Sequence, residues 1–493
     1  MVIWKVLGVA AYLLCLVAIG VVASRRMTSA RSYFAGDKSF GFWAGAFSAR
    51  ATGESAWLLI GLTGMGALVG VKAFWVVLGE VLGVLGAWAL MCGPFKRLTD
   101  RYDSITIPDY LESHFGDSKK TLRLVAAVAL VVFVTIYVSA QIDATGTAFE
   151  SFLGLNYYTG ALIGFGVVLA YIVSGGFVAV VWSDVFQGTL MFLGLVLLPI
   201  VGVVYAGGPA EVVEGLRGID ANLLSSTGGE GWTLSVTAEI IGLSLIGLGF
   251  LGSPQIFVRF LSLRSDREVL PGGIVAVIWT LFADSGAVLT GLVGRHLLTS
   301  TGQDVEVALG NGAQDVLPML SELVLPPVLV GLVIAIVLSA IMSTVDSLLV
   351  LASSAAIRDV WQKVLHPELP DEALVGLSRF GTAALAACAL GVALGVAALV
   401  PGRTVFWFVI FGWSGIAATF CPTMILSLGW RGFDKNGALA AMIVGFVSVP
   451  LYKFGAPELP GQLGVFFANL GELPPAFLTS MLAGVLVSLV SRK

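Results

Sequence analysis

The stretch Ser48-Ala-Arg-Ala-Thr-Gly-Glu-Ser-Ala56 decides how this chain folds. It lies in the middle of a hydrophobic segment, residues 40–67, that is long enough to cross a bilayer. Ionisable side chains within hydrocarbon are costly and mark functional positions. Gly53 and the small residues around it favour an interruption of the helix, which exposes carbonyl and amide groups that bind ions. The segment therefore predicts a membrane helix that is broken near the bilayer centre.

The composition excludes several classes of protein. Of the 493 residues, 57% are hydrophobic and only 12% are charged, about half the charged share of a soluble domain. The net charge of -4 provides no basic surface for nucleic acid. No Ser/His/Asp set, metal-ligand spacing or phosphate-binding loop points to an enzyme or to an organic cofactor. We expect one all-α, polytopic domain in the cell membrane, surrounded by lipid, with no obligatory protein partner.

Hydrophobic stretches separated by short polar joints recur along the whole chain, and they predict about thirteen transmembrane helices. An odd number places the two ends of the chain on opposite sides of the membrane. The expected spans are residues 4–24, 40–67, 71–95, 121–150, 157–177, 181–206, 235–261, 270–298, 323–357, 376–400, 404–429, 436–454 and 474–491.

Lysine and arginine predict the orientation, because short cytoplasmic loops retain positive charge. One set of alternate loops carries 20 of these residues and the other carries 6, with Arg50 alone left inside a span. The N-terminus is therefore expected outside and the C-terminus in the cytoplasm. The richer set comprises Arg25, Arg26, Arg31, Lys38, Lys96, Arg97, Arg101, Lys119, Lys120, Arg123, Arg259, Arg264, Arg267, Arg358, Lys363, Arg379, Arg431, Lys435, Arg492 and Lys493.

Arg50 and Glu54 are four residues apart and share one face of a continuous helix. One interpretation is an internal ion pair that gates the protein. The other is that the two side chains bind the carboxylate and the ammonium of a zwitterionic solute.

Three further acidic residues lie within spans. Glu80 and Asp284 each stand alone in a span with no visible partner, which predicts a structural role or a place at a cavity edge. Asp143 lies near the end of its span and is expected in a vestibule or between packed helices.

Two later segments resemble functional features of transporters. Gly247-Leu-Gly-Phe-Leu-Gly-Ser-Pro254 predicts a second broken helix, and broken helices in two halves of a chain indicate an inverted-repeat transporter. In the ninth span, the hydroxyls of Ser343 and Thr344 follow the carbonyl of Ala340 by about one turn. These oxygens suit a hard cation, although small residues at such positions also favour plain helix packing.

Five blocks together make the chain resemble the sodium/solute symporters, and within them the sodium/proline symporters. The resemblance runs from the second span to the twelfth. The blocks are Tyr171-Ile-Val-Ser-Gly-Gly-Phe-Val-Ala-Val-Val-Trp-Ser-Asp-Val-Phe-Gln187, Thr106-Ile-Pro-Asp-Tyr110, Gly247-Leu-Gly-Phe-Leu-Gly-Ser-Pro254 with Arg259-Phe260, Ala340-Ile-Met-Ser-Thr344, and Asn436-Gly-Ala-Leu-Ala-Ala-Met-Ile443.

This resemblance implies a leucine-transporter-like fold, a five-plus-five inverted repeat with extra helices at both ends, and alternating access around a central site. The first repeat is then expected at residues 40–206 and the second at 235–430. Residues 1–39 form the extra N-terminal helix and loop, and residues 436–493 form the extra C-terminal helices.

The resemblance also implies the site residues. Sodium is expected on the backbone carbonyls of Ala51, Glu54 and Ala340 and on the hydroxyls of Ser343 and Thr344. Asp184 is expected on the path by which sodium leaves. The solute is expected against Ser55, Ala56, Trp57, Tyr137, Ile246, Phe250 and Pro254.

Several of these positions depart from the proline carriers of the family. Those carriers have an aspartate in place of Gly53, a tryptophan in place of Ile246 and a tyrosine in place of Phe250, and a small residue in place of Arg50. The carboxylate is displaced by one position, to Glu54.

The sequence thus predicts a secondary active transporter that imports a small organic solute, an amino acid such as proline or a related metabolite, with sodium as the coupling ion. One alternative is a proton-coupled carrier of the same fold, because Glu54 could titrate in a cavity. The other is a membrane sensor module that does not transport.

Overall fold

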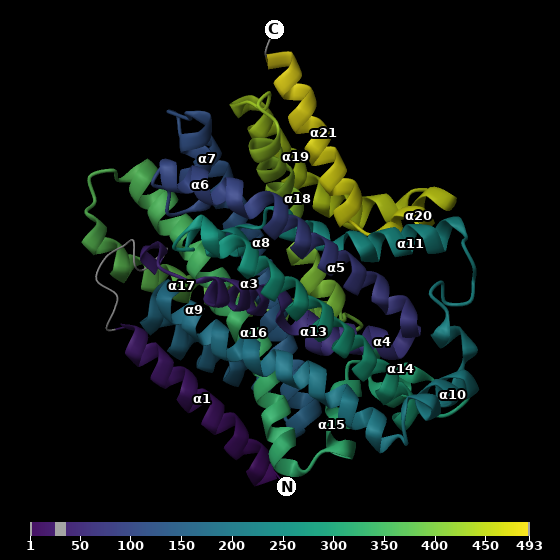
Figure 1. Ribbon diagram of the computed structural model, residues 1–493. Coiled ribbons are helices and arrows are strands. Elements are labelled where there is room, and N and C mark those ends of the chain that lie inside the picture. Colours follow the sequence, from purple (N-terminus) through teal and green to yellow (C-terminus); the bar gives the residue numbers. More distant parts are fainter. Residues whose placement is uncertain (1, 25–35, 492–493) are drawn as a thin grey trace.

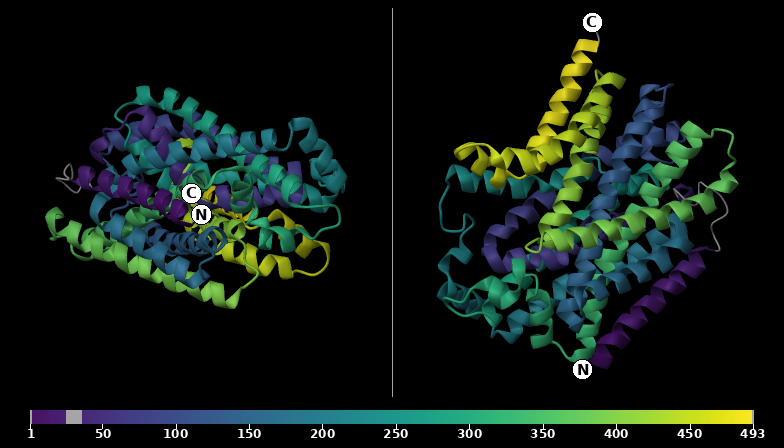
Figure 2. Two further views of the ribbon diagram at one scale, coloured as in Figure 1. Left: turned by 90° about the horizontal axis from the view of Figure 1, so that it is seen from below. Right: turned by 180° about the vertical axis from the view of Figure 1, so that it is seen from behind.

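The computed structural model describes residues 2–24 and 36–491, and these residues form helices and no strand. The start of α1 and the end of α21 lie at opposite ends of the molecule (Figures 1 and 2). The long elements are α1 (Val2–Ser24), α3 (Phe42–Ala56), α5 (Phe74–Gly86), α8 (Thr121–Leu153), α9 (Tyr157–Tyr205), α11 (Leu234–Ser244), α13 (Val269–Leu298), α16 (Pro327–Ser353), α17 (Asp371–Leu399), α18 (Val405–Gly429), α19 (Lys435–Pro450) and α21 (Leu473–Ser491).

Some side chains of the predicted block that begins at Tyr171 lie outside the described part of the chain, and so do Arg25, Arg26, Arg31, Arg492 and Lys493.

Shorter elements connect these helices. The connecting elements are η1 (Gly36–Lys38), η2 (Trp57–Leu62), α4 (Thr63–Val69), η3 (Gly70–Ala73), η4 (Ala87–Cys92), α6 (Gly93–Arg101), α7 (Ile107–Phe115), α10 (Pro209–Ile219), η5 (Ala221–Leu224), η6 (Leu245–Leu251), α12 (Pro254–Leu261), η7 (Asp266–Glu268), α14 (Val305–Leu309), η8 (Asn311–Ala313), α15 (Val316–Val324), η9 (Ser354–Leu365), η10 (Leu451–Gly455), η11 (Ala456–Glu458) and α20 (Gln462–Leu470).

The described residues contain eleven stretches that are long and apolar enough to cross a membrane, and not thirteen. Two pairs of expected spans account for the difference. The segments 40–67 and 71–95 belong to one stretch, Phe42–Arg101, in which the chain turns at Gly70 with φ 66°. The segments 157–177 and 181–206 both fall within α9, of which Phe177–Tyr205 is counted as a span. The joint expected between these two spans is therefore replaced by helix.

The predicted interruption in the second span is present at Ser55. Its backbone has φ 42° and ψ -166°, so α3 is broken one residue before its end and continues through the π-helical η2 into α4. A positive φ is uncommon for a residue with a side chain and persists only where the surroundings hold it. Every residue from Gly45 to Ala56 is buried, because α3 packs against α9, α12, α13 and α16.

The predicted second break is also present, in the seventh span. Helix α11 tightens into the 3₁₀-helical η6, which ends at Leu251, and α12 begins at Pro254. Pro fits the first helical position because it lacks the N–H that would have no partner there. The broken helices also meet at one end: Phe40 N donates to Ser262 O (3.2 Å) and Arg264 N donates to Phe40 O (2.9 Å).

Glycine allows η6 to lie directly on α5. A Cβ built on Gly79 would lie 1.9 Å from the carbonyl oxygen of Ser244, and one on Gly247 would lie 2.0 Å from that of Gly79. Only glycine permits this approach, in the manner of small residues between membrane helices. The contact brings α5, and with it Glu80, close to the core of the molecule.

A network of ion pairs joins α7, α8 and η9. Arg123 contacts the carboxylates of Asp109, Glu112 and Asp359, and Arg358 contacts Asp109 at 2.8 Å. Burial alone would raise the pKa of the Asp109 carboxyl, but the charges of Arg358 and Arg123 outweigh that effect and lower it to about 2. We call these five residues the paired network.

Candidate functional site

The break at Ser55 is held by two side chains of α8. Gln141 accepts a hydrogen bond from the backbone N–H of Ala56 (3.1 Å) and donates one from Nε2 to Ser55 Oγ (3.2 Å). The Tyr137 hydroxyl donates to the same Ser55 oxygen at 3.4 Å. Because Gln141 satisfies groups that the interrupted helix leaves free, it explains how the positive φ of Ser55 is maintained.

Aromatic packing extends this group to the second broken helix. Trp413 of α18 lies edge-on to Tyr137 (ring centroids 6.5 Å apart) and 5.0 Å from the Phe250 ring. Its Nε1 donates to the carbonyl of Ile246 at 3.0 Å. The structure thus gathers Ser55, Tyr137, Ile246 and Phe250, four of the seven residues expected against the solute.

The other three expected solute residues are placed differently. Ala56 joins the group through its backbone N–H and Gln141. Trp57 donates from Nε1 to Gly53 O at 3.3 Å and packs edge-on against Phe406 of α18. Pro254 is the first residue of α12, and its role there is to start the helix after the break.

Gln141 and Trp413 are absent from the sequence-based set of site residues. Gln141 carries an amide in an otherwise apolar span, and a search for buried neutral hydrogen-bonding groups would have found it. Trp413 lies in a span rich in aromatic residues and carries no distinguishing signal of its own.

Oxygen atoms of α3 and α16 gather on another side of the same break. Ser343 Oγ donates to the carbonyls of Ala51 (2.9 Å) and Ala340 (3.2 Å), and Thr344 Oγ1 donates to those of Thr52 (3.1 Å) and Ala340 (3.2 Å). Carbonyl and hydroxyl oxygens at this spacing are the hard ligands that a small cation requires. We call these atoms the hydroxyl group of ligands. Their mutual contacts do not involve Glu54, the fifth residue expected to bind sodium.

Asp184 of α9 lies beside α3 at Ser48, about one helical turn before Ala51 and Thr52. Its Oδ2 accepts from Ser48 Oγ (2.5 Å) and forms an ion pair with Arg259 Nη2 (3.0 Å). Arg259 also donates to Thr52 Oγ1 at 2.8 Å and to Ser347. The sequence placed Arg259 in a loop, and this placement is wrong: its side chain is 1% exposed within α12. Arg259 follows the predicted second broken helix closely in the sequence, and this position could have indicated that its side chain is buried.

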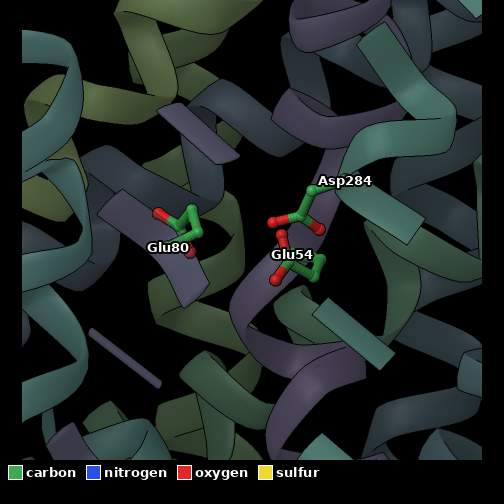
Figure 3. A group of neighbouring side chains, drawn as sticks. All are labelled: Glu54, Glu80 and Asp284. Atoms are coloured by element: carbon green, nitrogen blue, oxygen red, sulfur yellow. The ribbon is translucent and has the colours of Figure 1, made fainter. Parts of the chain in front are cut away.

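Four ionisable side chains meet on a third side of α3. Arg50 and Glu54 form an ion pair across one helical turn. Glu54, Glu80 of α5 and Asp284 of α13 each offer a carboxylate oxygen, and these three atoms lie within 4.8 Å of one another. Figure 3 shows the side chains of Asp284 and Glu54 ending beside each other, with Glu80 on the neighbouring helix. We call the three carboxylates the acid cluster.

The acid cluster corrects two expectations. Glu80 and Asp284 were expected to stand alone in their spans, whereas the fold brings both to Glu54. The Arg50 guanidinium lies 4.7 Å from the centroid of the Phe250 ring and 5.5 Å from that of Trp279. Cation–π contacts of this kind fix its position. The Arg50–Glu54 ion pair is therefore adjacent to Phe250, an expected solute residue.

The remaining acidic residue, Asp143, lies at a cavity of about 540 Å³ that Arg403 and Tyr157 also line. Arg403 Nε donates to Asp143 at 2.8 Å and the Tyr157 hydroxyl donates to it at 2.6 Å. Both expected roles apply, because Asp143 packs between helices and borders a cavity.

The model of the sodium:solute symporter family matches residues 33–445. The chain belongs to this family. Membership makes it a membrane transporter that couples a solute to sodium, and not an enzyme.

Curated relatives of this symporter extend over nearly all of its length. It is 34% identical to the high-affinity proline transporter PutP of Bacillus subtilis, over 96% of this chain and 95% of that protein. It is 30% identical to the osmoregulated proline transporter OpuE of Bacillus subtilis, over 99% of this chain and 95% of that protein. It is also 30% identical to the sodium/proline symporter of Escherichia coli, over 98% of this chain and 92% of that protein.

Solved structures show the fold of the symporter. A sodium-coupled sialic acid symporter in a substrate-bound, outward-open state matches with a TM-score of 0.81 at 18% identity, over 99% of this chain and 97% of that one. MhsT in complex with L-phenylalanine matches with a TM-score of 0.50 at 16% identity, over 90% and 97%. The predicted leucine-transporter-like fold is confirmed.

Proposed function

We propose that this symporter imports a small amino-acid-like solute, proline or a related compound, together with sodium. The observation that carries the proposal is the position of the α3 break. On one side, the carbonyls of Ala51 and Thr52 accept hydrogen bonds from the hydroxyls of Ser343 and Thr344. On another side, Ser55 meets Tyr137 and Gln141. One short segment therefore contacts both the expected sodium ligands and the expected solute residues.

This arrangement supports a direct form of coupling. Sodium held by the hydroxyl group of ligands and by the carbonyl of Glu54 would tie α3 to α16 and fix the conformation of Ser55 and Ala56. The solute then binds a segment that sodium has already ordered. Coupling arises because sodium has a higher affinity for the outward-facing state, in which the solute site is complete.

The chemistry of the solute site favours an amino acid. Backbone N–H groups at the start of a half-helix attract a negative charge, so the half-helix that begins after Ser55 suits a carboxylate. The proposed contacts are Ser55, Ala56, Trp57, Tyr137, Ile246, Phe250 and Pro254, with Gln141 added. Three of the curated relatives are named as proline transporters, which supports the same class of solute.

Gly53 and Phe250, which both differ from the residues of the proline carriers, form one local change. A Cβ on Gly53 would lie 2.8 Å from Cε1 of Phe250, so the two residues accommodate each other, while Arg50 packs on the same ring. The solute therefore meets an aromatic wall without the polar groups that proline carriers place there. A solute with a larger apolar part than proline fits this difference.

We further propose that residues 40–206 and 235–430 are the two inverted repeats, with the N-terminus outside and the C-terminus in the cytoplasm. In this orientation Asp184, with Arg259, lies on the inward path of sodium.

Uptake by the purified protein in proteoliposomes tests the function. A panel of radiolabelled amino acids, including proline, is offered under an inward sodium gradient and, separately, under an inward proton gradient in sodium-free buffer. We expect uptake only with sodium, and its loss in Ser343→Ala. Uptake driven by protons without sodium would show that sodium is not the coupling ion.

A further inference from the structure

We propose that the acid cluster of Glu54, Glu80 and Asp284 binds a second sodium ion, separate from the hydroxyl group of ligands. The inference rests on the proposed function in that it assigns one more coupling ion to the same transport cycle. It concerns a different face of α3, and it uses the side chain of Glu54, whose backbone carbonyl is proposed for the first sodium ion.

Charge is the first reason. Three carboxylates face one guanidinium, that of Arg50, so the ionised group carries a net charge of -2. Glu54, Glu80 and Asp284 are each at most 1% exposed, and water does not screen their repulsion. Buried charges are retained where they are paired or bind a metal. A bound cation lowers the repulsion among the three carboxylates.

The second reason is independent of the clustering. Both carboxylate oxygens of Asp284 are buried and have no hydrogen-bond donor among the residues that the structure describes. The same holds for Oε2 of Glu80. Buried acceptors are nearly always satisfied, and Asp284 points its unsatisfied oxygens at Glu54 (Figure 3). A cation among the three carboxylates satisfies these oxygens.

The arrangement of Arg50 limits where a cation binds. The guanidinium pairs with Glu54 and is covered by the Phe250 and Trp279 rings, so it cannot also turn toward Glu80 without losing those contacts. Asp284 and Glu80 therefore remain as the ligands that Arg50 does not occupy. They approach from α13, which packs against α3, and from α5, which packs against α13.

Membership of the sodium:solute symporter family favours sodium as this cation. Carboxylate oxygens are hard ligands that suit an alkali cation as well as calcium. Divalent ions are therefore the competing occupants, and the binding experiment distinguishes them from sodium.

The cluster is also distinct from the solute site. Ser55 faces α8, where Tyr137 and Gln141 contact it, while Glu54, the preceding residue, faces α5 and α13. The three sides of α3 near its break thus bear the hydroxyl group of ligands, the solute residues and the acid cluster. Sodium in the cluster would order the same segment from a second direction.

Direct binding of radioactive sodium to the purified full-length protein tests the proposal. We expect two sodium ions per wild-type chain and one in Asp284→Asn, with the affinity of the remaining ion changed less than about threefold. The sodium dependence of uptake is expected to fall from a Hill coefficient near two to one near one. Ser343→Ala should retain the ion held by the cluster.

Matched variants separate a lost site from a damaged fold. Glu80→Gln should reproduce Asp284→Asn, and it carries the test if that variant does not reach the membrane. Glu322→Gln, which removes the partner of Lys5 in a peripheral ion pair, should bind two ions as wild type does.

Three results would overturn the proposal. One is a single sodium ion in wild type that both cluster variants still bind. Another is tight binding of calcium or manganese that sodium does not displace, since this would assign the cluster to a divalent ion. The third is no sodium binding or sodium-driven uptake at all, which would overturn the proposed function as well. The first two results leave sodium-coupled transport standing.

Discussion

The paired network and the acid cluster are both made of three carboxylates, but they differ in the cations that face them. In the paired network, Arg123 and Arg358 reach Asp109, Glu112 and Asp359. In the acid cluster, Arg50 alone faces Glu54, Glu80 and Asp284. The first arrangement supplies its own positive charge and holds helices together. The second leaves oxygens without donors, and we infer that a cation from outside the protein complements them.

The largest effect is expected from Arg123→Ala in the paired network. The substitution removes the guanidinium that contacts all three carboxylates, and breaking a buried ion pair costs about 3–5 kcal/mol. Thermal unfolding in detergent should show a large fall in the midpoint. Arg217→Ala, which breaks an exposed pair with Glu214, is the control and should cost about 0–1 kcal/mol. An Arg123 variant as stable as this control would show that the network is not structural.

Arg50→Ala should behave differently from Arg123→Ala, because an ion can compensate for it. We expect the variant to be less stable than wild type in N-methylglucamine chloride and to recover more stability than wild type in sodium chloride at equal ionic strength. An ion at about 100 times its dissociation constant stabilises a protein by about 2.7 kcal/mol. An equal gain from sodium in both proteins would remove the distinction between the two regions.

Gln141→Ala probes a third kind of region, in which neutral groups hold a strained backbone. The change leaves the Ala56 N–H and the Ser55 hydroxyl short of partners, and unsatisfied buried groups cost about 1–3 kcal/mol each. Solute affinity should fall with stability, and the number of sodium ions bound to the acid cluster should not change. Gln303→Ala, at an exposed hydrogen bond to Ser300, is the control. Unchanged solute affinity would show that Gln141 does not shape the site.

The smallest effect concerns pH. The pKa of Asp109 is lowered to about 2, below its value of about 3.9 in an unfolded chain, so its contribution to stability is complete above about pH 4 and is lost as the pH falls toward 2. The difference in unfolding midpoint between wild type and Asp109→Asn should therefore shrink as the pH falls from about 4 toward about 2. A difference that stays the same over this range would contradict the assigned ion pairs.

The sequence predicted the breaks at Ser55 and near Gly252 because glycine, proline and polar residues mark such positions locally. It could not predict the acid cluster, since Glu80 and Asp284 are about two hundred residues apart and meet only because α13 packs against both α5 and α3. The exact count of thirteen spans is not confirmed, because hydropathy does not show where a helix continues through a polar joint, as it does in α9. Gln141 was missed because an amide carries no charge.

The short backbone bridge between Phe40 and Leu263 gives the broken helices a mechanical connection. It joins the entrance of α3 to the exit of α12, so these two ends form a common pivot. Beyond this bridge, the interruptions at Ser55 and Gly252 separate each span into two helical segments. We expect a tilt of α3 to carry α12 with it, because the bridge holds their two ends together.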